Sequence, residues 1–282
     1  MSIRIIVDSA CDITQEEAKK WNLDILPLKT IFGDEEYLDG VTMSHTQFFE
    51  KLVETDVLPT TSQIAPYEYE EKFAEIVNNG DTAICITLSS KLSGCYQSAN
   101  IAVEGYEDQI IVVDSENVCI GERILIQLAD KLRKEGKTIQ QIADILNQKK
   151  KDIRLIALLD TLEYLKKGGR ISKTVAMAGK LLSIKPVIAV ENGEVTILGK
   201  ARGSKSGKNM LTEFVKKTGG IDFDCPYCLA YSGLSDKLLK KYVEDSENLY
   251  KGNAEEFPIS TIGSTIGTHV GPGAIAAAFF VV

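Results

Sequence analysis

The chain is poor in the features that mark secreted, membrane-spanning and disulfide-built proteins. None of its apolar runs approaches the roughly 20 residues that a helix needs to cross a bilayer. Its N-terminus turns polar after Val7, which is not the pattern of a secretory signal peptide. Six cysteines spread through 282 residues are too sparse for a disulfide framework and fit a reducing compartment. We therefore expect a cytoplasmic protein that is stabilised by an apolar core.

Positive charge is also in short supply. The 32 Lys and Arg residues are outnumbered by 40 Asp and Glu residues, so the formal net charge is −8. A negative surface disfavours nucleic acids and anionic membranes as partners. We expect a monomer with no nucleic-acid partner and at most a transient contact with membranes. Histidine is scarce as well, because the sequence holds only His45 and His269.

What the first half does contain is an alternation of short apolar runs and amphipathic helical patterns. The runs at residues 4–7, 25–31, 82–88, 109–113 and 155–159 are typical of strands. Between them, Thr14, Ser44 and Thr138 each begin a capping box, and Pro66 suits the first turn of a helix. This alternation predicts an α/β domain with a parallel sheet over residues 1–152.

The second half has a different pattern. Predicted strands at 186–190 and 194–198 flank Asn192-Gly193, a sequence that favours a β-hairpin. A helix over 204–217, a strand over 229–232, a helix over 235–250, a strand over 257–262 and a final apolar run follow. We expect a smaller α+β domain over residues 153–282, with the segment Lys149-Lys-Lys-Asp152 as the seam.

Several familiar motifs almost appear, and each departs from its pattern. Residues 271–276 fit G-x-G-x-x-A, but only nine residues follow Gly273, too few for a dinucleotide-binding unit. Residues 203–208 are one residue short of a phosphate-binding P-loop. Cys225-Pro-Tyr-Cys228 leads into a strand-like run, whereas a redox-active pair needs a helix N-terminus that stabilises its thiolate. A zinc site would need a second pair of ligands at suitable spacing, and none is visible in the sequence. We expect no nucleotide, metal or other cofactor, and two structural cysteines.

Ser93, Asp114 and His269 follow one another in the order of an α/β-hydrolase triad. The segment around Ser93 lacks the G-x-S-x-G elbow that holds a nucleophilic hydroxyl in position for attack. A lipid esterase that uses these three residues stays an alternative.

The segments that remain are suited to binding an anion. The stretch Gly267–Ala274 places His269 among three glycines and a proline, in a predicted loop where the backbone can approach a ligand and the imidazole can donate. Hydroxyl-rich segments at 59–63 and 89–94 precede helices and offer O–H and N–H groups to a carboxylate or phosphate. Arg170 and Arg202 add positive charge. Taken singly, each also has an ordinary explanation as a helix cap, a turn or a solvated surface residue.

Taken together, these segments resemble the DegV family along the whole chain. The matching segments are Val7-Asp-Ser9, Thr60-Thr-Ser-Gln63, Ser93-Gly94, Val113-Asp-Ser115, Leu162–Ser172, Lys185-Pro186, Ala201-Arg-Gly203 and Gly267–Ala274. One departure is Ile64, where the family often has proline after Ser-Gln. That change should alter the stiffness of the loop and not its chemistry.

The resemblance implies a two-domain α/β protein that holds a long-chain fatty acid between its domains. Such proteins serve as the acyl-carrying subunit of bacterial fatty acid kinase, so the chain itself is not an enzyme and has no ATP site. A separate ATP-dependent kinase subunit phosphorylates the bound carboxylate to acyl-phosphate. The resemblance implies carboxylate contacts by Thr61, Ser93 and His269, with Ser62 and Gly94 in the same loops, Arg170 near the head group, and Arg202 on the face that meets the kinase.

A fatty acid needs one polar anchor and a long apolar tunnel, and the sequence offers both. Candidate tunnel walls are the apolar runs at 25–31, 177–184 and 274–280, whose ordinary role is the hydrophobic core. A lipid transport or sensor protein without a kinase partner is the second alternative.

Overall fold

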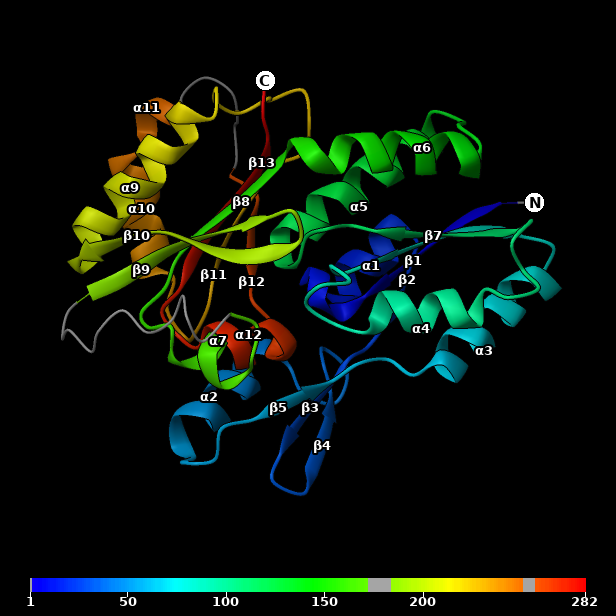
Figure 1. The fold of residues 1–282 in the computed structure, drawn as a ribbon, viewed down its shortest axis with the longest axis horizontal. Helices are drawn as coiled ribbons and strands as arrows, with labels where there is room; N and C mark the ends of the chain where they lie inside the picture. Colours follow the sequence, from blue (N-terminus) through cyan, green and yellow to red (C-terminus); the bar gives the residue numbers. More distant parts are fainter. Residues whose placement is uncertain (1, 172–183, 251–256) are drawn as a thin grey trace.

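The computed structural model describes residues 2–171, 184–250 and 257–282, and its strands form three sheets (Figure 1). The first sheet has four parallel strands in the order β2-β1-β6-β7. Its strands are β1 (Ile3–Asp8), β2 (Leu23–Leu26), β6 (Thr82–Thr87) and β7 (Ile110–Asp114). The predicted parallel sheet is therefore confirmed.

Helices cover this parallel sheet, and those with a start signal in the sequence begin where that signal predicts. They are α1 (Gln15–Trp21), α3 (Pro66–Asn78), α4 (Cys95–Ala102), α5 (Cys119–Lys134) and α6 (Ile139–Lys149). The capping boxes of Thr14 and Thr138 are both formed, as is that of Ser44 before α2 (His45–Glu54). Pro66 occupies the first turn of α3. Each capping box depends on residues only three positions apart, so the tertiary contacts of the fold do not alter where the helix begins.

A small antiparallel sheet with the order β4-β3-β5 was not predicted. Its strands are β3 (Lys29–Phe32), β4 (Glu35–Leu38) and β5 (Thr60–Ser62). The single strand expected over 25–31 is wrong, because β2 ends at Leu26 and β3 begins at Lys29. Pro27 lies between them and has no N–H for a strand ladder, so the run divides between two sheets.

The second half forms a six-stranded mixed sheet in the order β10-β9-β8-β13-β11-β12. Its strands are β8 (Ile153–Leu158), β9 (Ile184–Glu191), β10 (Glu194–Arg202), β11 (Cys228–Tyr231), β12 (Ile259–Thr261) and β13 (Ile275–Phe280). The β9–β10 hairpin turns at Asn192 and Gly193, both with positive φ, as predicted. The last strand, β13, lies between β8 and β11, so the end of the chain completes the centre of this sheet.

The helices of the second half divide between an outer layer and the space near the small sheet (Figure 1). The outer layer holds α9 (Gly203–Lys217), α10 (Lys237–Asp245) and α11 (Glu247–Tyr250). The single helix predicted over 235–250 is broken at Ser246. Two short helices, α7 (Glu163–Lys167) and α12 (Ser264–Val270), pack against each other near α2. No helix in the described ranges has the length and apolar character to cross a membrane.

One apolar core runs from the parallel sheet through α5 to the inner face of the mixed sheet. It joins Ile5, Ile84 and Ile124 of the first half to Leu155 and Ala276 of the second. The expected seam ends in a 3-10 turn, Lys150–Asp152, directly before β8. The two sheets thus face each other across a shared interior, which is where a ligand cavity can form.

Candidate functional site

A cavity of about 310 Å³ lies between the parallel sheet and the mixed sheet. Polar residues cluster at one end, and apolar residues form most of the remaining wall. Of the described lining residues, Arg170 alone carries a full charge. The apolar and small residues of the wall are Leu28, Leu88, Leu92, Val118, Cys119, Leu155, Ala157, Leu159, Leu165, Ile188, Ala189, Val190, Val195, Ile262, Ile266, Val270, Ala274 and Ala276.

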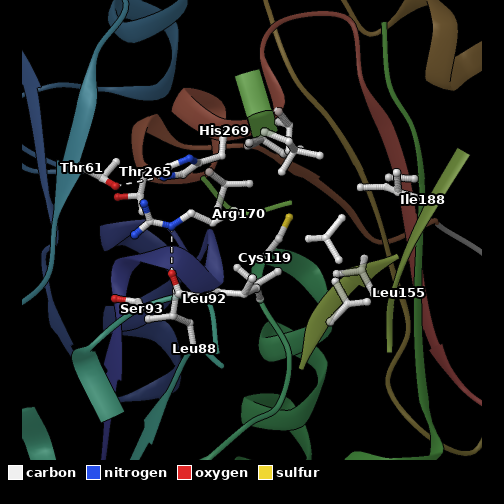
Figure 2. Close-up of a pocket in the computed structure, with 18 of the residues that line it drawn as sticks. Thr61, Leu88, Leu92, Ser93, Cys119, Leu155, Arg170, Ile188, Thr265 and His269 are labelled. Carbon is white, nitrogen blue, oxygen red and sulfur yellow. Dashed lines mark hydrogen bonds between the residues drawn. The ribbon is translucent and has the colours of Figure 1, made fainter. Parts of the chain in front are cut away.

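All six residues that the resemblance places at a carboxylate line the cavity: Thr61, Ser62, Ser93, Gly94, Arg170 and His269. Figure 2 shows Thr61, Ser93, Arg170 and His269 at one end, while Leu155 and Ile188 lie at the other. Thr61 and Ser62 lie on β5 of the small sheet, and Ser93 and Gly94 lie in the β6–α4 loop. Arg170 lies in the segment that follows α7, and His269 lies on α12. The fold therefore brings together residues separated by up to 208 positions in the chain.

The prediction that His269 lies in a loop is wrong, because it sits on the last turn of α12. Its Nε2 lies 2.9 Å from Thr61 Oγ1, within hydrogen-bonding distance. Its Nδ1 is buried and has no partner in the described part of the chain. Burial, with a smaller contribution from Arg170, lowers the pKa of His269 to about 4. The ring is therefore neutral near pH 7, with Nδ1 packed against Gly168 and Nε2 directed at Thr61.

Residues far away in sequence hold α12 in place. The Asp39 carboxylate accepts hydrogen bonds from the backbone N–H groups of Ser264 at 2.9 Å and Thr265 at 3.3 Å. Asp12 Oδ1 accepts from Gly263 N at 2.7 Å. Carboxylates at a helix N-terminus satisfy N–H groups that lack a partner within the helix. The local sequence, rich in Thr and Gly, favours a loop, and these distant caps make it a helix.

The β6–α4 loop carries Ser93 and Gly94 to the cavity. Ser93 Oγ donates to Cys95 Sγ and accepts from the Cys95 N–H, both at 3.4 Å, so a ligand competes with only weak hydrogen bonds for this hydroxyl. A Cβ on Gly94 would lie 1.9 Å from Gln63 Oε1, so glycine leaves room for the Gln63 amide. Gln63 Nε2 donates to Ser98 Oγ at 2.9 Å and so fixes the Thr61–Ser62 segment against α4.

Arg170 bridges the two halves beside the cavity. Its Nε donates to the Leu92 carbonyl at 3.0 Å, and its Nη1 donates to the Gly168 carbonyl at 2.8 Å. A Cβ on Gly168 would lie 2.2 Å from His269 Nδ1, so this glycine leaves room for the imidazole. Sequence analysis assigned no role of their own to Gly168, Gln63 and Asp39, although the first two lie in segments that carry the family resemblance, because each acts through a long-range contact.

The expected tunnel walls are confirmed only in part. Within the predicted run 25–31, Leu28 lines the cavity, and within 274–280, Ala274 and Ala276 do. The run 177–184 lies outside the described residues except for Ile184. Eight of the eighteen apolar and small wall residues come from β8, β9, α12 and the residue before α5, and none of these eight was named for this role.

The hydrolase alternative finds little support in the geometry. Asp114 Oδ1 accepts hydrogen bonds from Glu116 N at 2.8 Å and Ser90 N at 3.3 Å, which fixes the turn after β7. His269 Nε2 faces Thr61 and not Ser93. In the described ranges no hydrogen bond joins Ser93, His269 and Asp114 to one another. The nucleophile, base and orienting acid of a triad require those links.

Cys225, Cys228 and Arg202 all lie outside the cavity lining. Both cysteines are free, and Cys228 opens β11. Burial raises the pKa of Cys225 and raises that of Cys228 to about 12, which is the reverse of an activated thiolate. The described residues hold no group of three or more His, Cys, Asp or Glu side chains arranged to bind a metal. Arg202 is exposed at the junction of β10 and α9.

Comparison with known proteins gives one consistent result along the whole chain. The family model described as "Uncharacterised protein, DegV family" matches residues 2–282. A DegV domain-containing protein of Caldanaerobacter subterraneus is 34% identical over 281 residues, which cover 99% of this chain and 98% of that protein. A second, from Clostridium perfringens, is 34% identical over 286 residues, with 99% and 98% coverage.

Solved structures agree in fold. A DegV family protein from Thermus thermophilus, described by its fatty acid binding, superposes with a TM-score of 0.88 at 28% identity, covering 100% of both chains. A stearic acid-binding protein from Eubacterium ventriosum gives 0.87 at 26% identity, covering 99% of this chain and 98% of that one. DegV from Bacillus subtilis, a fatty acid binding protein, gives 0.84 at 29% identity with 99% coverage of both. With its parallel-sheet domain, mixed-sheet domain and cavity between them, the chain belongs to the DegV family.

Proposed function

We propose that this protein binds a long-chain fatty acid, with the acyl chain in the cavity between the two sheets and the carboxylate at its polar end. The observation that carries the proposal is the cavity itself. It has about 310 Å³ of space, an almost uncharged wall and one cluster of hydrogen-bonding groups. Related structures with the same fold bind fatty acids, including stearic acid.

The acyl chain supplies most of the affinity in this proposal. About fifteen methylenes at ~0.8 kcal/mol each contribute roughly 12 kcal/mol of transfer free energy. Each hydrogen bond to a charged head group adds only about 1.5–3 kcal/mol. The head-group residues therefore orient the ligand, and the apolar wall retains it.

The carboxylate would interact with four side chains in this arrangement. Arg170 supplies positive charge, while Thr61, Ser93 and His269 supply hydrogen bonds, and Ser62 and Gly94 shape the same end of the cavity. All six are partly exposed, whereas Cys119, Leu155, Ile188 and Ala276 are buried. The carboxyl group would thus lie near the surface, where a second protein can reach it.

We further propose that a separate ATP-dependent kinase subunit phosphorylates this carboxylate to acyl-phosphate, with Arg202 on the docking face. The exposed arginine and the partly exposed head-group residues support this arrangement. In this function the protein is a cytoplasmic monomer, carries its fatty acid as a ligand and not as a cofactor, and performs no chemistry alone.

Mass spectrometry of lipid extracted from the purified, denatured protein tests the binding step. We expect one long-chain fatty acid per protein molecule. A preparation that yields no fatty acid, and that takes up none when offered palmitic, stearic or oleic acid, would contradict the proposal.

The phosphorylation step needs a second experiment. Loaded protein, ATP and the purified kinase subunit of the same organism should together yield acyl-phosphate, trapped as a hydroxamate. Acyl-phosphate that never forms, with binding intact, would favour a transport or sensor role. Turnover of a fatty acyl ester by the protein alone would favour the esterase.

A further inference from the structure

A second cavity, of about 510 Å³, adjoins the first along the same face of the mixed sheet. Ile153 and Leu155 are two residues apart on β8, so their side chains point to the same face. Leu155 lines the acyl cavity and Ile153 lines the second one. The described residues around the second cavity are mostly polar: Glu116, Asn117, Lys150, Lys151, Ile153, Arg154, Val190, Glu191 and Asn192.

Val190 lines both cavities. It is 7% exposed and pairs with Leu155 across the β8–β9 ladder. On the opposite side, Val118 lines the acyl cavity and its neighbour Asn117 lines the second one. Val190 and the Asn117–Val118 pair therefore form a partition between an apolar space and a charged one.

Ser89 holds both sides of this partition in place. Its backbone N–H donates to the Asn117 carbonyl at 2.7 Å, and its hydroxyl donates to the Gly193 carbonyl, also at 2.7 Å. Ser89 is fully buried. A Cβ on Gly193 would lie 2.5 Å from Ser89 Oγ, so the hairpin tip is closely packed against this residue. A partition held by buried hydrogen bonds resists displacement by a ligand.

The partition lies far from the head-group end. Figure 2 shows Leu155, the ladder partner of Val190, across the cavity from Thr61 and His269. We propose that Val190 sets the longest acyl chain that this protein binds well, an inference that rests on the proposed fatty acid binding. A chain that reaches past Val190 leaves apolar surroundings and meets Lys151, Arg154 and Glu191. Its added methylenes gain no burial and displace water from charged groups.

The test measures the dissociation constant of delipidated protein for straight-chain saturated fatty acids of increasing length. Burial of one more methylene tightens binding by about fourfold. We expect this gain to continue up to one chain length and then to stop or reverse. We call that chain length the break. Val190→Ala removes two methyl groups, so the break should move to chains longer by about one to two carbons.

Val187→Ala is the matched control. It is the same chemical change at a buried residue of the same strand, β9, and Val187 lines neither cavity because it packs in the core on the other face of the sheet. We expect Val187→Ala to leave the break at its original length. Ser89→Ala should instead blunt the break, because the Gly193 side of the partition loses its hydrogen bond to the Ser89 hydroxyl while the backbone bond to Asn117 stays.

Each outcome of the chain-length series supports or contradicts the proposed role of Val190. A wild-type series with no break, or a break that Val190→Ala and Val187→Ala move equally, would overturn the role of Val190 while leaving fatty acid binding intact. A protein that binds no fatty acid of any length would overturn the proposed function as well. Thermal unfolding of the variants, measured without ligand, shows whether a lost break reflects a lost fold.

Discussion

At the scale of single residues, His269 shows how burial prepares a side chain for a ligand. In the free protein its pKa is about 4, because burial and the nearby Arg170 both disfavour the charged ring. An unfolded histidine has a pKa near 6.5. Between about pH 6.5 and pH 4 the unfolded chain therefore binds a proton that the folded chain does not. This group alone lowers stability as pH falls through that window, and its neutral ring is available at pH 7.

A carboxylate bound beside His269 should reverse this preference. An adjacent negative charge raises a histidine pKa, here above the value of about 4 in the free protein. Fatty acid affinity should then increase as pH falls from neutral through the raised pKa toward about 4, with uptake of up to one proton. Calorimetric titration in buffers of different ionisation enthalpy measures this uptake. His269→Gln should remove it, and equal proton uptake by both proteins would show that another group is responsible.

Ser93 should affect chemistry more than retention of the ligand. Its hydroxyl has only long contacts at 3.4 Å in the free protein, so Ser93→Ala should leave the fold almost unchanged. Losing one hydrogen bond to the carboxylate costs about 1.5–3 kcal/mol, against a much larger contribution from the acyl chain. We expect lipid to co-purify with the variant while acyl-phosphate yield falls at least tenfold, because the carboxylate is no longer aligned. An acyl-serine adduct at Ser93 in the unaltered protein would instead indicate the esterase.

At the scale of elements, sequence signals succeed where they are local. Thr14, Ser44 and Thr138 each start a helix because their capping partners lie three residues away. The Asn192-Gly193 hairpin follows from two adjacent residues with positive φ. By contrast, α12 depends on Asp12 and Asp39, which lie more than 200 positions away. Residues that neighbour α12 in the sequence give no sign of such a distant cap. His269 is therefore predicted in a loop, whereas the structure places it on a helix.

Asp39→Asn tests whether that distant cap positions His269. An amide keeps one acceptor but cannot accept from both Ser264 N and Thr265 N as the carboxylate does. We expect a loss of about 1–3 kcal/mol in unfolding free energy, measured by urea titration. Acyl-phosphate yield per bound fatty acid should also fall, because α12 no longer holds the His269 imidazole in its position beside Thr61. Asp34→Asn, an exposed residue in the β3–β4 turn, is the matched control and should change neither quantity.

At the scale of the whole molecule, the sequence predicts the two larger sheets but not the small one, and its resemblance to the DegV family implies the residues of the polar end. Alternating patterns distinguish a parallel half from a mixed half, and each polar motif lies in a segment of its own. The acyl wall could not be assigned in the same way. Leu155 and Val190 look like any buried strand residues, and only the packing of one sheet against the other places them beside a cavity.

Arg202 is an exposed positive charge outside the cavity, in a chain whose net charge is −8. It is exposed at the start of α9, as is Lys205, whereas Lys208 is buried and paired with Asp245 at 2.5 Å. Long-range charge attraction mainly raises association rate and specificity, and salt screens it. Arg202→Glu should therefore keep full lipid occupancy but bind the kinase subunit at least tenfold more weakly, with a smaller dependence on salt.

Lys217→Glu makes the same charge change at the opposite end of α9, where the side chain is also exposed. If net charge alone governs association, this variant and Arg202→Glu should weaken kinase binding equally. If Arg202 lies in the docking face, Arg202→Glu should have the larger effect on both the association rate and acyl-phosphate yield. Loss of bound lipid in Arg202→Glu, with normal kinase binding, would instead place Arg202 in the ligand site. Measuring lipid occupancy and kinase association on the same preparations separates these three results.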